Sequence, residues 1–218
     1  MLNAIDTVTV SDAIAGKIDD RKALLAVRVP LVMQKIEQAF APLKPIVEAR
    51  LKQSLTDTGS RRGKFVKINE ILSDVRDISS TFAACGAGCS ACCTQRVMMS
   101  QTEAEAIGHK ISRKPVQLRP SYVLPEIDTF GSETPCTFLS NNVCTIYEHR
   151  PFACRNLVNL DVDPLLCRFE NWELSKAKDA RSTGIPLLSA GPLEQAYSSL
   201  SGRDMIGDIR AFFPISAC

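Results

Sequence analysis

Four of the nine cysteines in this chain lie within nine residues, in the segment 85–93. A reduced cysteine can serve as a small apolar core residue, as a nucleophile or as a metal ligand. The segment has the spacing C-x3-C-x2-C-C, and its C-x2-C step is typical of thiolates that hold one tetrahedral metal ion. We therefore interpret the segment as one half of a metal site. Its candidate ligands are Cys85, Cys89, Cys92 and Cys93.

A second group of cysteines follows between residues 136 and 167. Two short β-prone runs flank residues 140–142, Ser-Asn-Asn, where the backbone tolerates left-handed angles, so we expect a small β-hairpin there. Pro151 predicts the start of a helix that carries a cysteine in its first turn. The candidate ligands of this half are Cys136, Cys144, Cys154 and Cys167.

The order and neighbours of these cysteines resemble the YkgJ-like cysteine-cluster family. The resemblance rests on C-x3-C-x2-C-C, then P-C-x-F-L, then C-x-I-Y-E-x-R-P-x-x-C-R, and covers roughly residues 81–170. The family is described as a zinc- or iron-chelating domain with a C-x2-C-x2-CC run, so the extra residue between Cys85 and Cys89 is a departure. The resemblance implies that all eight of these cysteines chelate metal. Cys218 has no counterpart in the family pattern.

Eight thiolates are enough for two sites of four ligands each, because structural zinc takes four ligands in a tetrahedron. Neighbouring residues direct their side chains differently, so we expect Cys92 and Cys93 to serve different sites, or different metals of one polynuclear site. Gly86 and Gly88 would let the backbone turn tightly around the ligands. A [4Fe-4S] cluster also takes four cysteine thiolates, so the spacing leaves zinc, iron and the cluster open. Disulfides are the remaining alternative. The adjacent cysteines argue against them, because a bridge between neighbouring residues would be strained.

Thiolate ligands need positive charge nearby, because four of them around one divalent ion leave a net negative charge. We expect two or more arginines to donate hydrogen bonds to ligand sulfurs. His149 is an alternative ligand, although eight thiols already complete two sites. The candidate arginines are Arg96, Arg150, Arg155 and Arg168.

The fold class we expect is mainly α with a small β-hairpin. We divide the chain into a helical N-terminal region (residues 1–80), a cysteine-cluster metal-binding domain (81–170) organised by its metal, and a helical C-terminal extension (171–218). Apolar residues at helical spacing predict one well-defined helix before the cluster. They are Phe65, Ile68, Ile71, Leu72, Val75 and Ile78.

Several other elements follow from local signals. Pro30 and Pro45 predict the first turns of two helices, and the basic string 61–64 predicts a solvated loop. Ser100 and Glu103 predict a capping box at the start of a helix over 101–112. We also expect helices near 192–200 and over 203–213.

The composition excludes several classes of function. The net charge is +2 and the chain has no concentrated basic stripe, so we expect no nucleic-acid partner. No apolar run is long enough to span a membrane, and no secretory signal pattern precedes residue 20, so we expect a cytoplasmic protein. Two histidines without a nucleophile partner argue against a hydrolase. Residues 86–91 match the G-x-G-x-x-A pattern of dinucleotide-binding turns. Because they follow a helical pattern rather than a strand, we expect no dinucleotide site there.

We therefore expect a non-enzymatic metal-binding protein, in which zinc or iron organises the cysteine domain and the N-terminal helices bind a protein partner. The alternative is an iron-sulfur redox or accessory protein for a modifying enzyme such as a protein methylase. That alternative comes from the resemblance, since some relatives of the domain are joined to flagellin lysine methylation.

Overall fold

A computed structural model describes residues 4–86, 88–126, 129–131, 133–168, 171 and 185–215, with side chains from residue 16 onward. Cys218 and much of the predicted C-terminal extension lie outside the described residues. The fold is mainly helical with two small antiparallel sheets, as predicted. Its elements are α1 (Ala4–Phe40), α2 (Lys44–Thr56), α3 (Arg61–Ser79), η1 (Ser80–Phe82), η2 (Ala91–Thr94), β1 (Met98–Ser100), α4 (Gln101–Lys110), β2 (Leu139–Ser140), β3 (Val143–Cys144), η4 (Tyr147–His149), α5 (Phe152–Asn156), η5 (Leu165–Cys167), α7 (Pro192–Ser201), β4 (Ile206–Asp208) and α8 (Ile209–Phe212).

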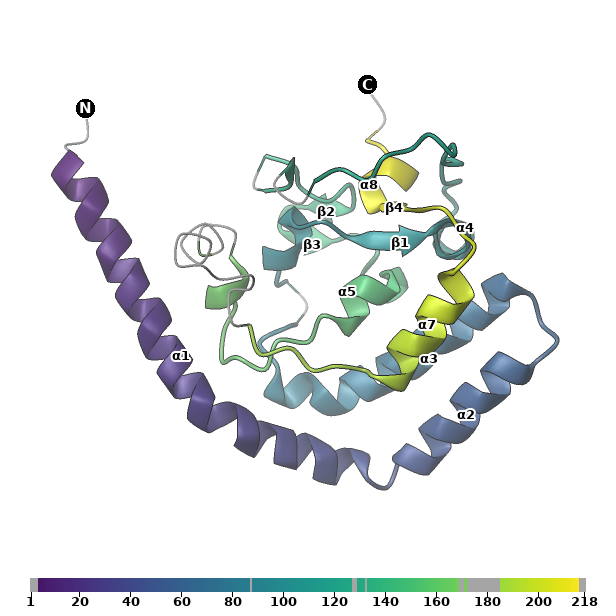
Figure 1. Ribbon diagram of the computed structural model, residues 1–218, viewed down its shortest axis with the longest axis horizontal. Helices are drawn as coiled ribbons and strands as arrows, with labels where there is room; N and C mark the ends of the chain where they lie inside the picture. Colours follow the sequence, from purple (N-terminus) through teal and green to yellow (C-terminus); the bar gives the residue numbers. More distant parts are fainter. Residues whose placement is uncertain are drawn as a thin grey trace.

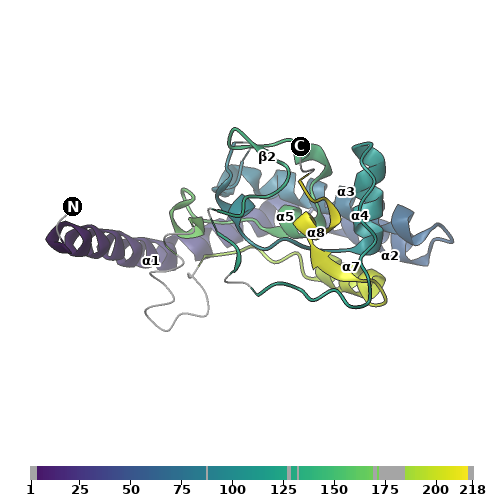
Figure 2. The same cartoon turned by 90° about the horizontal axis from the view of Figure 1, so that it is seen from above.

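Helix α3 is the element against which most other helices pack. It contacts α1, α2, α4, α5 and α7. The predicted apolar face is confirmed, because Phe65, Ile68, Ile71 and Leu72 are all buried. Figure 1 shows α1, α2 and α3 forming an arc around the irregular part of the chain, while Figure 2 shows the N-terminal part of α1 extending away from it. The N-terminal helices thus form the outer support of the cysteine region.

Helix α1 runs through Pro30, so the prediction that this proline begins a helix is wrong. Proline inside a helix removes one hydrogen bond and bends the helix, and α1 is visibly bent (Figure 1). Apolar residues on both sides of Pro30 are buried, among them Leu25 before it and Val32 after it. Packing against the body of the protein therefore outweighs the local break. Pro45 does lie in the first turn of α2, as predicted.

The basic string 61–64 is the first turn of α3, and the predicted loop is therefore wrong. Ser60 caps this helix by accepting a hydrogen bond from the Gly63 N–H. Arg61 donates to the Thr102 hydroxyl at 2.8 Å and forms an ion pair with Asp204. These contacts of Arg61 thus connect the start of α3 to the start of α4.

The hairpin predicted around residues 140–142 is present, as strands β2 and β3. Leu139 pairs with Cys144, and both turn residues take left-handed angles, with φ of 49° at Asn141 and 59° at Asn142. Two consecutive positive φ values are typical of the tight turn that suits the twist of a hairpin.

The helix predicted over 203–213 is wrong in its first half, where residues 206–208 form strand β4. This strand pairs with β1, so that Met98 lies opposite Asp208. The Asp208 carboxylate accepts hydrogen bonds from the Val97 N–H at 2.8 Å and from the Arg210 N–H at 2.9 Å. It therefore ends the strand and caps the short helix α8 at the same time.

A buried carboxylate, that of Glu103, joins four helices. The Ser100 hydroxyl caps α4 as predicted, by accepting from the Glu103 N–H at 3.2 Å. The Glu103 side chain does not complete a capping box. Its carboxylate accepts instead from the Phe152 N–H at 2.7 Å, the Tyr197 hydroxyl at 2.6 Å and the Asn69 amide at 3.2 Å. Burial raises the pKa of Glu103 and of Tyr197.

The described helices include none that is both long and apolar enough to cross a membrane.

The Glu103→Ala variant should lose about 3 kcal/mol of folding free energy, because the buried donors of Phe152, Tyr197 and Asn69 lose their acceptor. Denaturant unfolding monitored by circular dichroism measures this loss. Glu105→Ala, on the same helix, removes only an exposed bond with Gln117 and should cost less than about 0.5 kcal/mol. Equal effects of the two substitutions would contradict the role given to Glu103.

Candidate metal centre

Six of the eight candidate cysteines line one cavity of about 40 Å³. A cavity of this size exceeds the roughly 10–15 Å³ that one water needs, so it has room for a metal ion. Its other walls are mainly apolar and include Val97, Phe138 and Ile146. The two distant segments therefore converge in space. The six cysteines are Cys89, Cys92, Cys93, Cys136, Cys144 and Cys154.

A backbone hydrogen bond ties the two segments together, since the Cys136 N–H donates to the Cys93 carbonyl at 2.7 Å. Arg210 also donates to that carbonyl, at 3.1 Å. Cys92 and Cys93 lie in the 3-10 turn η2, where successive side chains point about 120° apart because the turn has three residues per repeat. Gly88 takes the expected left-handed backbone, with φ of 88°, whereas Gly86 does not.

The second segment holds its cysteines on short elements. Cys144 ends strand β3 and Cys154 lies in the first turn of α5, where its N–H donates to the Pro151 carbonyl at 3.0 Å. Cys136 precedes the hairpin and its carbonyl accepts from the Leu139 N–H at 2.9 Å. Local turns thus fix the positions of three candidate ligands.

Cys85 and Cys167 meet through Asn159, a residue that the sequence analysis missed. The Asn159 backbone N–H donates to the Cys85 sulfur at 3.3 Å, and its side-chain amide donates to the Cys167 sulfur at 3.2 Å. Asn159 is only 1% exposed, and its side-chain oxygen accepts from the Asp161 N–H. The sequence feature that could have revealed Asn159 is its position as the one amide in the otherwise apolar run of residues 157–160.

Burial keeps most of these thiols protonated. It raises the pKa of Cys85, Cys136 and Cys154, and it raises the pKa of Cys167 to about 12. Nearby thiols add to the rise by mutual repulsion of their anions. Metal binding at these cysteines would therefore release protons.

Cys92 differs from the others. Interaction with the neighbouring Cys93 thiol is the main cause that lowers the pKa of Cys92 to about 7, and the charges of Arg150 and Arg76 act in the same direction, against the effect of burial. The same interaction raises the pKa of Cys93. Cys92 is therefore the first of this pair to become a thiolate.

The four candidate arginines lie in different surroundings. Arg150 lines the thiol cavity, stacks with its guanidinium 3.5 Å from the Tyr147 ring centroid and donates to the Tyr147 carbonyl. Arg155 donates to the Ser73 hydroxyl and faces another cavity. Arg96 donates to a backbone carbonyl, and Arg168 is exposed. Among the described residues, none of the four donates a hydrogen bond to a cysteine sulfur.

A further arginine, Arg76 of α3, was not foreseen. It is 9% exposed, one of its terminal nitrogens has no hydrogen-bond partner, and its guanidinium lies 5.8 Å from the Tyr147 ring centroid. Its charge acts on Cys85 and Cys92 in the direction that favours their thiolates. Arg76 follows Leu72 by four residues, on the buried face of the predicted helix, which was the available signal.

The eight described cysteines are all free thiols, so the disulfide alternative does not hold for them. Within the described part of the chain, no three cysteine, histidine or carboxylate side chains lie close enough to bind one ion as they are placed. Binding therefore requires the thiols to deprotonate and their side chains to rotate toward the ion. His149 lines the other cavity and not the thiol cavity.

Residues 84–179 match the sequence model of the family CxxCxxCC, described as "Putative zinc- or iron-chelating domain". The matched segment contains all eight candidate cysteines and confirms the resemblance seen in the sequence. Comparisons with curated proteins and with solved structures gave no match.

The Asn159→Ala variant should lose about 2 kcal/mol of folding free energy, because the Asp161 N–H loses its acceptor in a buried position. Asn159→Asp keeps that acceptor but removes the donor to Cys167, so it separates the two roles of the side chain. Urea unfolding of the metal-free proteins provides the measurement. Relative to the wild type, we expect Asn159→Asp to be less stable at neutral pH than at low pH, because the buried carboxyl is a charged group without a donor when ionised and can donate to Cys167 when neutral. A wild-type stability in Asn159→Ala would contradict the assignment.

Proposed function

We propose that the protein binds zinc or iron through the eight cysteines of residues 84–179, the segment that matches the family model, in two sites of four thiolates. The family description supports metal binding in general. The convergence of six cysteines on one cavity is the observation that carries the proposal. The donor set suits both metals, since thiolates bind zinc and iron well.

The first proposed site combines four cysteines around Asn159. The hydrogen bonds from Asn159 to two sulfurs support this grouping. So does the electrostatics, because the pKa of Cys167 is raised by burial and then by the thiols of the other three members. The members are Cys85, Cys89, Cys92 and Cys167.

The second proposed site combines Cys93 with the cysteines of the hairpin and α5. The pKa of Cys93 is raised by Cys92 and by burial, and then by Cys136 and Cys154. The division gives adjacent Cys92 and Cys93 to different sites, which their different directions favour. The members are Cys93, Cys136, Cys144 and Cys154.

We propose a structural, non-enzymatic role for the metal within the predicted domain of residues 81–170. Eight thiolate ligands leave no open position for a metal-bound water, which a catalytic zinc site needs. Free thiols at all eight positions fit a reducing compartment, so we propose a cytoplasmic location.

We further propose that helix α1 presents a surface to a protein partner. Leu24, Val27 and Leu31 are spaced by three and four residues on one face and are all exposed, Val27 to 68%. Their spacing forms an apolar stripe on the outside of the helix.

Metal analysis of the full-length protein, prepared without oxygen, tests the two-site proposal. We expect about two equivalents of zinc or iron for the wild type and about one for either Cys144→Ser or Cys167→Ser, since each variant lacks one ligand of one site. Cys218→Ser, outside the family pattern, should keep both equivalents. A brown protein with acid-labile sulfide would support the iron-sulfur accessory role instead. A wild type without metal would refute the proposal.

The Arg76→Met variant should have opposite effects on stability and on metal affinity. Methionine removes a buried charge at similar length, so the metal-free protein should gain about 1 kcal/mol. The bound thiolates lose a compensating charge, so metal affinity should fall roughly tenfold. Unfolding and competition with a chromophoric chelator measure the two quantities. Arg62→Met, exposed on the same helix, should change neither. A parallel loss of stability and affinity would indicate a packing role only.

A further inference from the structure

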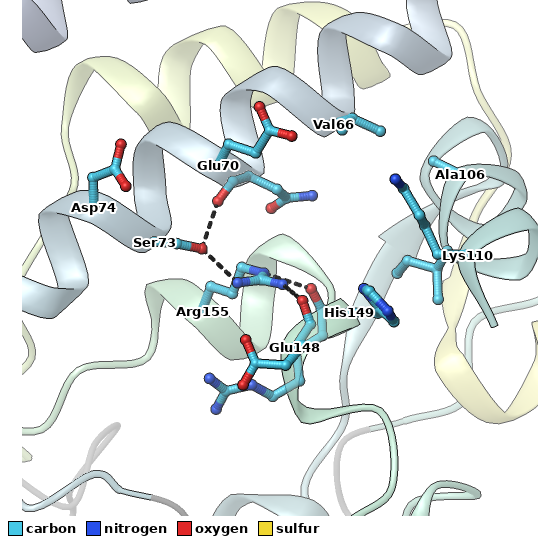
Figure 3. Close-up of a pocket in the computed structure, with 12 residues that line it drawn as sticks. Val66, Glu70, Ser73, Asp74, Ala106, Lys110, Glu148, His149 and Arg155 are labelled. Carbon is cyan, nitrogen blue, oxygen red and sulfur yellow. Dashed lines mark hydrogen bonds between the residues drawn. The ribbon is translucent and has the colours of Figure 1, made fainter.

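A second, larger cavity of about 400 Å³ lies between α3, α4 and the segment from η4 to α5. Cavities of roughly 300–1,000 Å³ are typical of small-molecule sites. Figure 3 shows Lys110 and His149 on one side of Arg155 and Asp74 on the other. No part of the proposed metal function uses this cavity, although Arg150 lines both cavities.

The cavity contains a positive charge without a carboxylate partner. Arg155 donates to the Ser73 hydroxyl at 2.5 Å, to the Arg150 carbonyl at 2.8 Å and to the Glu148 carbonyl, all of which are neutral acceptors. Three of the five guanidinium N–H groups are thus used. Among the described residues no carboxylate forms an ion pair with Arg155. The Arg155 side chain is half-buried, and a cation that is partly removed from water without an anion nearby costs free energy. A carboxylate from a ligand would relieve this cost through a charge-assisted hydrogen bond.

The same cavity also contains one buried acceptor without a donor and two exposed carboxylates without an ion-pair partner among the described residues. The side-chain oxygen of Asn69 is buried and has no hydrogen-bond partner, while its amide nitrogen is held by Glu103. The exposed carboxylates of Glu70 and Glu148 form no ion pair within the described residues. Asp74 differs, because it is paired with Arg50. These groups would attract the ammonium group of a ligand.

We propose that this cavity binds a small zwitterion with one carboxylate and one ammonium group, the chemistry of a free amino acid. Its carboxylate would face Arg155, with Lys110 at the rim. Its ammonium would face the Asn69 oxygen and the Glu70 carboxylate. The volume accommodates an amino acid together with its side chain. The site does not depend on bound metal.

Titration calorimetry on the full chain as purified tests the proposal with the twenty common amino acids as probes. For the amino acid that binds best, its N-acetyl and carboxamide derivatives should each bind at least about tenfold more weakly, because each lacks one of the two charges. Equal binding of either derivative, tighter binding of inorganic phosphate, or no binding of any amino acid at millimolar concentration would overturn the proposal.

Two surface variants assign the two charges while leaving the buried residues intact. Glu70→Gln should weaken the best amino acid about tenfold and leave its N-acetyl derivative unchanged, whereas Lys110→Met should weaken both. Glu48→Gln, exposed on α2, is the matched control and should bind as the wild type does. If Glu70→Gln and Glu48→Gln bind the amino acid alike, the ammonium site does not exist.

Discussion

Three guanidinium groups beside the two cavities, those of Arg76, Arg150 and Arg155, have no carboxylate partner within the described residues. Two of them approach the ring of Tyr147, and each lowers the pKa of Cys92. A buried cation is expensive unless an anion compensates it. On one side of these guanidinium groups, the chain itself can supply thiolates as anions. The larger cavity lies on their other side. The positive charge therefore makes sense as part of a binding region and not as a source of fold stability.

Helix α3 carries the residues on which both cavities depend, and the packing around it explains why they hold their positions. Arg76 serves the thiol side, whereas Asn69 and Ser73 line the larger cavity. The Glu103 carboxylate fixes Asn69 from α4 and, through the Phe152 N–H, the start of the helix that carries Cys154. One buried acceptor thus sets the relative positions of the two regions. The Glu103 carboxylate has no ion-pair partner among the described residues, and three hydrogen bonds stabilise it in its buried position. The folded chain retains these bonds only while α3, α4, α5 and α7 stay packed.

Local signals in the sequence were sufficient for elements whose cause is local. The hairpin follows from two asparagines that tolerate positive φ, and the buried face of α3 follows from its apolar spacing. Elements decided by distant contacts were not predictable in this way. Pro30 remains inside α1 because apolar residues on both sides are buried, and β4 forms because β1 offers it a partner. At the candidate site, the spacing identified the cysteines, but it did not identify Arg76 or Asn159. Both act through contacts between residues far apart in the chain.

The adjacent thiols Cys92 and Cys93 explain how two sites of four cysteines would influence one another. The interaction that lowers the pKa of Cys92 raises that of Cys93, so the two thiols do not lose their protons independently. In the proposed division, each of these thiols belongs to a different site. The two sites would therefore meet at one pair of neighbouring residues, and the protonation of a ligand in one site would be linked to the protonation of a ligand in the other.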